Sequence, residues 1–497
     1  MVNSTYCLHT ASLFNFRCYG EEHQQVRLGK ECTVIIGYNG AGKTAFLTGI
    51  KKGLSFILSK DRRRSVSFIG DGHDIRESAF KVKDVRYEYN SGVVDHDYHY
   101  PCRVTLSASV MGEELEWKYE KPYKGRSLDK ALFRPQLDQV LARYASGEAP
   151  APLPVLAYFS DSYPHVRASL TRYEKDLLVD KADAVERRAG YYHWDETSTD
   201  FYLWRDLFCH ALRKLEHPTS GIEATRQRLA SASQLNLTAE TVATLQTHLH
   251  VLERVGREVS LVKQTLRKFT QTFATKDNRD FALYDLTIGS YLEGNKEVFT
   301  LLLRFEDGHT TLFDMLPEGY KRLLAIAFEI VYRFVVLNRP CFDAHPTLQP
   351  EGIVIIDELE LHLHPTLAQE ALIRLRNAFP SIQFIVSTHS PAVVGNVKAD
   401  GDLCRVLQLD SSHRFNEVKD SFGMDYSDTL LTRMGSYGRM HTLALLEELY
   451  REYRADGDNE GVDETLAELR TFFGDSPQAE QWTADMVASW NERMEDV

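Results

Sequence analysis

The sequence predicts an α/β fold with a mixed sheet and covering helices, a helical insertion and a helical C-terminal region. Three observations lead to this prediction. The apolar run Thr33–Ile36 leads directly into the glycine-rich segment Gly37–Thr44, and a second apolar run, Ile353–Ile356, ends in two carboxylates. A third run, Ile382–Val386, ends in a polar segment. Short, continuously apolar runs of this kind are typical of parallel strands buried on both faces of a sheet.

The glycine-rich segment matches the phosphate-binding pattern G-x-x-x-x-G-K-[ST], between an apolar strand and an apolar helix as the pattern requires. A chance glycine-rich turn is the alternative, and the flanking strand and helix argue against it. Glycines allow successive N–H groups, here at Asn39, Gly40 and Gly42, to point at phosphate oxygens. Lys43 adds a positive charge, and the Thr44 hydroxyl can complete a Mg²⁺ shell. The pattern therefore predicts a nucleoside triphosphate site.

Polar groups follow the two later apolar runs. Asp357 and Glu358 come directly after one run, and His389 follows the other. Ligands of doubly wound sheets bind outside the carboxyl ends of the strands, so these side chains are expected at the phosphate loop. Asp357 is placed to hold Mg²⁺, Glu358 to orient and deprotonate the attacking water, and His389 to hydrogen-bond the γ phosphate. A structural ion pair is the alternative for the two carboxylates.

Composition limits the function classes. The 497 residues include 71 acidic and 58 basic ones, and the net charge of -13 argues against a protein that coats nucleic acid. Basic clusters at Lys51–Arg64 and Lys118–Arg134 could still contact it, although a solvated helix end is favoured for the first. The seven cysteines form no C-x-x-C pair, which indicates reduced, partly buried thiols. Without a signal segment or a long apolar stretch, a cytoplasmic protein with no membrane segment is expected.

Aromatic residues gather at Gly190–Trp194 and Phe201–Trp204. Stacked nucleic-acid bases are one interpretation, and a core between helices is the favoured one.

The segments GYNGAGKT, IVIIDELELHLHP and STHSP together resemble the ABC-type P-loop ATPase heads of the RecF, SMC and OLD group. The resemblance implies ATP and Mg²⁺ as cofactors. It also places Asn15-Phe16-Arg17, which matches a first-strand pattern of these heads, near the nucleotide. Leu316-Pro-Glu-Gly319 stands at the signature position, which implies that Gly319 caps the nucleotide of a second copy in a head-to-tail dimer. Pro317 departs from the family's pattern, where a hydroxyl is usual, and puts fast hydrolysis in doubt.

Within this group, the order of the motifs and the segments Leu337–Pro340 and Phe422–Tyr426 are most similar to Septu (PtuA-like) ATPases, including those linked to retrons. That resemblance implies an antiphage defence ATPase, a homo-oligomer that controls an HNH-type effector nuclease. In a retron setting it adds a reverse transcriptase and its RNA–DNA product as partners. The alternatives are a RecF-like DNA-repair ATPase and an OLD-like ATPase-nuclease. The tail's Asp-x-Asp, Asp456-Gly-Asp458, is predicted to be a solvated turn, so no intrinsic nuclease is expected.

These patterns predict four parts. Residues 1–169 form the N-terminal part of the head, with antiparallel strands between 85 and 120; residues 170–275 form a helical insertion. Residues 276–410 form the C-terminal part of the head, and 411–497 form an acidic helical region. Its helices either pack on the head or bind a basic partner.

Overall fold

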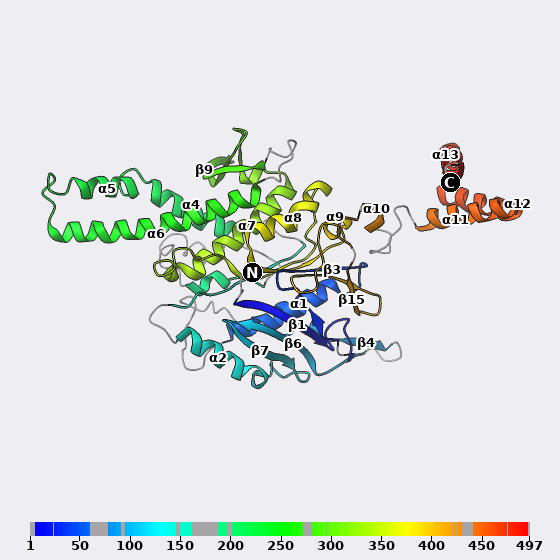
Figure 1. The fold of residues 1–497 in the computed structure, drawn as a ribbon, viewed down its shortest axis with the longest axis horizontal. Coiled ribbons are helices and arrows are strands. Elements are labelled where there is room, and N and C mark those ends of the chain that lie inside the picture. Colours follow the sequence, from blue (N-terminus) through cyan, green and yellow to red (C-terminus); the bar gives the residue numbers. More distant parts are fainter. Residues whose placement is uncertain are drawn as a thin grey trace. The chain divides into compact units, whose positions relative to one another are not determined.

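In a computed structural model the chain forms two compact units, Met1–Gly423 and Met424–Val497 (Figure 1). The described residues are 5–22, 24–59, 78–90, 95–145, 150–161, 187–195, 201–271, 281–294, 296–419, 421–424, 426–429, 441–474 and 476–495.

A six-stranded sheet forms the centre of the first unit. Its order is β15-β14-β3-β13-β12-β8, and all neighbours are parallel except the pair of β14 and β15. The strands are β3 (Cys32–Gly37), β8 (Val155–Phe159), β12 (Glu351–Ile356), β13 (Ser381–Ser387), β14 (Cys404–Leu409) and β15 (Phe415–Val418). The three apolar runs in the sequence are thus adjacent parallel strands, which confirms the predicted mixed sheet. Strand β15 lies beyond residue 411, where the helical region was expected to begin.

An antiparallel sheet with the order β2-β1-β6-β7 packs on the other side of helix α1 (Lys43–Leu54), which contacts β3 and β13 as well as β1 and β6 (Figure 1). Its strands are β1 (Tyr6–Phe14), β2 (Val26–Arg27), β6 (Cys102–Val110) and β7 (Glu113–Lys121), and a separate hairpin pairs β4 (Tyr87–Asn90) with β5 (Asp95–Tyr98). This confirms the antiparallel strands predicted between 85 and 120.

The expectation that Asn15-Phe16-Arg17 lies on the first strand is wrong. Strand β1 ends at Phe14, and both Asn15 and Arg17 have positive φ angles, of 48° and 52°. These left-handed conformations are incompatible with a strand, so the segment forms the turn after it.

Helices cover the remaining parts of the unit. They are α2 (Arg134–Ala145), α4 (Phe201–Glu216), α5 (Ile222–Ala230), α6 (Ala239–Thr270), α7 (Glu318–Asn338), α8 (Pro365–Ala378) and α9 (Pro391–Val394). Between α6 and α7 the chain forms a small sheet of β9 (Leu283–Glu293), β10 (Lys296–Phe305) and β11 (Thr310–Leu312). Parts of the expected helical insertion, residues 170–186, 196–200 and 272–275, lie outside the described residues.

The aromatic runs form core. Trp194, Phe201 and Trp204 are buried, and the Phe201 ring stacks on Phe313 with centroids 4.5 Å apart. Rings enclosed in this way are not available to bases, so the interpretation as helix–helix core is confirmed.

The first basic cluster is not a solvated helix end where the structure describes it. Lys51 and Lys52 are buried: Lys52 Nζ lies 3.1 Å from an Asp84 oxygen, and Lys51 Nζ lies 3.9 Å from the centre of the Tyr158 ring. Burial lowers the pKa of Lys51 to about 8. The arginines of the cluster, residues 62–64, lie outside the described residues.

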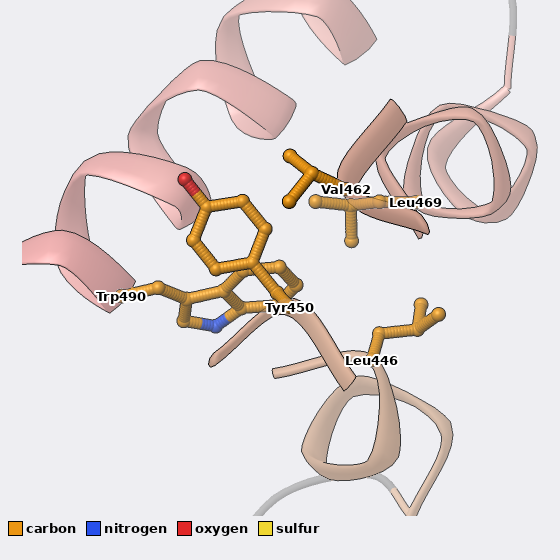
Figure 2. Packing of buried hydrophobic residues seen from close by; sticks show 5 residues of the cluster. All are labelled: Leu446, Tyr450, Val462, Leu469 and Trp490. Carbon is orange, nitrogen blue, oxygen red and sulfur yellow. The ribbon is translucent and has the colours of Figure 1, made fainter. Parts of the chain in front are cut away.

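The second unit contains α10 (Tyr426–Asp428), α11 (His441–Asp456), α12 (Asn459–Phe473) and α13 (Pro477–Glu495). The three long helices enclose a core of their own, shown in Figure 2, made of Leu446, Tyr450, Val462, Leu469 and Trp490. Asp456 ends α11 and Asp458 caps α12, accepting from the N–H groups of Glu460 and Gly461. All residues of this turn are exposed, as predicted. No described helix is both long and apolar enough to cross a membrane.

Candidate nucleotide site

The phosphate loop connects β3 to α1. Gly37, Gly40 and Gly42 have backbone φ angles of 154°, 82° and 108°, which residues other than glycine rarely adopt. Lys43 is buried, and its Nζ donates to the carbonyls of Gly37 at 2.8 Å and Tyr38 at 3.1 Å. The ammonium therefore lies inside the curl of the loop, while Asn39, Gly40 and Thr44 are exposed beside it.

Residues distant in sequence anchor this loop. The Tyr19 hydroxyl donates to the carbonyl of Gly42 at 3.0 Å, and His413 Nδ1 hydrogen-bonds the carbonyl of Ala41 at 2.7 Å. A Cβ atom at position 42 would lie 2.7 Å from the sulfur of Cys18. Only glycine lets the backbone approach this closely, so the last glycine of the motif also has a packing role.

The carboxyl ends of β12 and β13 bring the second part of the site together. Asp357 is buried; the Ser387 hydroxyl donates to its Oδ1, and the Tyr158 hydroxyl lies 3.4 Å from its Oδ2. The N–H of Glu358 donates to Ser387 Oγ at 2.8 Å. Ser387, which the sequence reasoning did not single out, thus ties the two strand ends. Its position directly before Thr388-His389, in the same polar segment after the strand, could have identified it from the sequence.

Five charged or titratable side chains, those of Lys43, Asp357, Glu358, Glu360 and His389, interact electrostatically here. Burial, followed by the negative charges of Asp357 and Glu360, raises the pKa of Glu358, whereas the charge of Lys43 opposes this shift. Burial lowers the pKa of Lys43 despite the three carboxylates, and it lowers the pKa of His389, with Lys43 adding to that effect. These mutual effects place the loop lysine and the strand-end groups in one electrostatic environment.

Glu360 belongs to this group and was not predicted as a site residue. It accepts a hydrogen bond from the backbone N–H of His389, and its buried Oε2 has no hydrogen-bond partner among the described residues. Glu358, two residues before it, has a φ angle of 51°, a strained conformation of the kind that clusters at functional sites.

Arg322 holds the backbone of the strand ends. Its side chain, 1% exposed, donates to four carbonyls: those of Asp357 at 3.1 Å and Glu358 at 3.0 Å after β12, and those of Ser160 at 3.3 Å and Asp161 at 2.9 Å after β8. The residue lies one turn into α7, beyond Gly319. A charged residue near the start of a long apolar helix could have indicated this role. The sequence alone, however, does not distinguish a buried arginine from a solvated one at that position.

Two residues assigned to the nucleotide have partners within this chain. Arg17 pairs with Asp84, 2.9 Å from Nη2 to Oδ1, and its Nη1 lies 3.3 Å from Thr48 Oγ1. Gly319 packs so tightly that a Cβ atom there would lie 2.7 Å from the carbonyl oxygen of His362. Their contacts with nucleotide stay predictions. Pro317 is the residue before α7 and provides no side-chain cap.

A cavity of about 540 Å³ lies beside the loop. Cys18, Tyr19 and His413, which line it, are also the residues that contact Ala41 and Gly42. A cavity of this size suits a nucleoside. The sequence reasoning missed it because its walls come from the turn after β1, from α1 and from the loop before β15.

The side-chain oxygen atoms at this site also suit Mg²⁺, which prefers oxygen ligands and is bound by one or two carboxylates together with phosphates. Asp357 and the exposed Thr44 hydroxyl are oxygen donors of this kind. The cation would polarise the phosphate oxygens and neutralise the charge that develops on them.

Comparison with known proteins identifies relatives. The sequence profile of the family described as "AAA domain, putative AbiEii toxin, Type IV TA system" matches residues 32–395, from β3 to α9. The "Retron Vc95 probable ATPase" of Vibrio cholerae is 24% identical over 421 residues, which cover 81% of this chain and 74% of that protein. The "Septu protein PtuA" of Bacillus mycoides is 34% identical over 152 residues, 30% of this chain and 20% of that protein.

Among solved structures, an Smc head bound to the C-terminal winged-helix domain of ScpA covers 83% of this chain and 98% of its own, with 13% identity and a TM-score of 0.39. The family profile spans most of the first unit, including the phosphate loop and both strand ends. The chain therefore belongs to this AAA family and is a P-loop ATPase.

Proposed function

We propose that the chain is the ATP-dependent regulator of an antiphage defence complex, in which ATP occupancy controls a partner HNH-type nuclease. The observation that carries the proposal is the convergence of Lys43, Asp357 and Glu358 in one electrostatic environment, in a chain whose relatives are named for retron and Septu systems. In a retron setting, a reverse transcriptase and its RNA–DNA product are further partners.

In this proposal ATP lies between two copies joined head to tail. The phosphate loop of one copy holds the triphosphate, and Gly319 at the start of α7 in the other copy caps it with backbone N–H groups and the helix dipole. The cavity beside the loop takes the nucleoside. Because Pro317 offers no hydroxyl, the cap is weaker than usual, which favours a clamp that senses ATP over a fast enzyme.

Within each site, Glu358 orients the attacking water and accepts its proton. Its pKa is raised, so it is a stronger base than an ordinary glutamate once deprotonated. His389, whose pKa is lowered, is a neutral imidazole at pH 7 and can donate one hydrogen bond to the γ phosphate. Asp357 and Thr44 hold Mg²⁺. Arg322 acts as a positioning residue, because its four carbonyl contacts fix the turn that carries Asp357 and Glu358.

The rate of hydrolysis is expected to fall on acidification at a higher pH than for an ordinary glutamate. Since the deprotonated form is the base and its pKa lies above the usual 4.5, activity is present above the raised pKa and is lost as the pH falls through it. Phosphate release at saturating ATP between pH 5 and 8 measures this. Glu360→Gln should move the acidic limb to lower pH by removing a neighbouring charge. If the acidic side of the pH–rate profile is unchanged in Glu360→Gln, Glu358 is not the base.

Replacing Arg322 by methionine is expected to lower kcat by about 10- to 100-fold and to change KM only a few-fold. The four carbonyls lose their donors and Glu358 loses its position, while the phosphate loop keeps its contacts. Steady-state kinetics separate the two constants, and Arg322→Lys, which retains a donor, should restore part of kcat. If kcat stays within two-fold in the folded methionine variant, Arg322 has a structural role only.

Co-purification tests the function as a whole. The wild-type chain, expressed with its neighbouring genes, is expected to purify with an HNH-type protein in a complex whose nuclease activity changes with ATP. Recovery of the ATPase without such a partner contradicts the proposal.

One surface favours the rival, a RecF-like ATPase that acts directly on DNA. Lys118 on β7 and Lys124, Arg126 and Lys130 after it are exposed, and the Arg126 guanidinium lies 5.6 Å from the centre of the exposed Tyr123 ring. Basic side chains next to an aromatic ring suit a nucleic-acid strand. Stimulation of ATP hydrolysis by duplex DNA in the isolated chain, lost in Lys124→Glu/Arg126→Glu, would establish this rival. Metal-dependent nicking by the chain alone would instead indicate an OLD-like ATPase-nuclease.

A further inference from the structure

The charge of the protein is concentrated at its C-terminal end. Residues 441–497 contain 15 of the 71 acidic residues and only 4 of the 58 basic ones, so they carry -11 of the net charge of -13. The first 440 residues are close to neutral by comparison. Most of these acidic residues lie on the helices of the second unit, α11 to α13.

These helices do not need another part of the chain to form a core. Leu446, Tyr450 and Val462 pack with Leu469 and Trp490 inside the three-helix unit (Figure 2). The sequence left open whether these helices pack on the head. Their buried apolar side chains instead pack on one another within the unit. Apolar side chains that stay exposed outside this core consequently need a different explanation.

An aromatic surface of this kind lies where α12 ends and α13 begins. Phe472 and Trp482 are 37% and 48% exposed. Both contact the half-buried Phe473, with ring centroids 5.3 Å and 6.1 Å from it. Phe473 in turn packs against the core of the unit, so the exposed rings stand on a supported base.

Each exposed ring has an exposed carboxylate one helical turn away. Glu468 lies four residues before Phe472 on α12, and Asp485 lies three residues after Trp482 on α13. Residues at these spacings share a helix face. We call Glu468, Phe472, Phe473, Trp482 and Asp485 the aromatic-acidic surface.

We propose that the aromatic-acidic surface is a docking site for a basic partner protein, whose apolar side chain covers the rings while flanking lysine or arginine residues meet the carboxylates. Half-exposed tryptophan and phenylalanine are the kind of side chain that dominates binding energy at interfaces. An arginine can in addition lie over the tryptophan ring. A second copy of this chain would bring like charges together, which disfavours self-association through this surface.

This inference rests on the proposed function, since the partner it commits to is the nuclease proposed there. The experiment uses the full-length chain and the purified HNH-type protein encoded beside it, with binding measured by calorimetry at two salt concentrations. Phe472→Ala/Trp482→Ala is expected to raise Kd by about 30-fold or more. Glu468→Lys/Asp485→Lys should raise Kd and make it less dependent on salt. Leu445→Ala, which removes an exposed apolar side chain on α11, is the matched control and should change Kd less than two-fold.

ATP hydrolysis should be unchanged in all of these variants because the substituted side chains lie outside the nucleotide site, and the melting temperature should change little because none of them belongs to the buried core of the unit. If the wild-type chain binds the nuclease and the aromatic variant binds it equally well, the docking site is wrong and the proposed function stands. If the wild-type chain does not bind it, both are wrong. If the aromatic variant instead lowers the mass of the free chain in light scattering, the surface is a self-association site and the inference is overturned.

Discussion

Replacing Glu358 by glutamine is expected to lower ATP hydrolysis by about 10² to 10⁴-fold, the usual contribution of a general base, while ATP binding is retained. Glutamine keeps the size of the side chain but cannot accept the proton of water. It also removes one of the negative charges that face Asp357 and Glu360. Less repulsion of the triphosphate means that bound ATP persists, so the ATP-bound dimer should accumulate.

Phosphate release and light scattering with and without ATP measure the two effects of Glu358→Gln. Glu306→Gln, at an exposed position after β10, is the control and should behave like the wild type. If Glu358→Gln leaves both hydrolysis and dimerisation unchanged, Glu358 is not the base.

Replacing Lys43 by alanine is expected to weaken ATP binding by at least about 100-fold, which corresponds to ~2.7 kcal/mol. The ammonium lies inside the loop and contacts the carbonyls of Gly37 and Tyr38, where it is available to phosphate oxygens with little rearrangement. Charge-assisted hydrogen bonds to phosphate are among the strongest in proteins, and alanine supplies none.

Titration with a fluorescent ATP analogue measures the Lys43→Ala effect, and the rise in melting temperature that saturating ATP gives the wild type should disappear. Lys398→Ala, at an exposed position, removes a charge outside the loop and should bind ATP normally. Binding by Lys43→Ala within a few-fold of the wild type would show that the backbone of the loop alone holds the triphosphate.

The sequence by itself determined the features that depend on local pattern. The strand–loop–helix unit at Gly37–Thr44, the carboxylates after β12 and the antiparallel strands between 85 and 120 were all read from consecutive residues. Strands of a parallel sheet that is covered on both faces are continuously apolar, and their carboxyl ends meet at one edge of the sheet, so the polar residues after them were expected together.

Only the tertiary structure decided which partner each polar side chain has. Lys51 and Lys52 looked solvated in the sequence, but both are buried, Lys51 against the Tyr158 ring and Lys52 beside Asp84. Arg322 holds carbonyls at the ends of two different strands, and Arg17 pairs with Asp84. Such contacts join residues tens to hundreds of positions apart, and a charged side chain has the same local signature whether water or a buried group binds it. The phosphate loop was thus predictable as a motif, whereas the residues that anchor it, Tyr19 and His413, became visible only once the chain was folded.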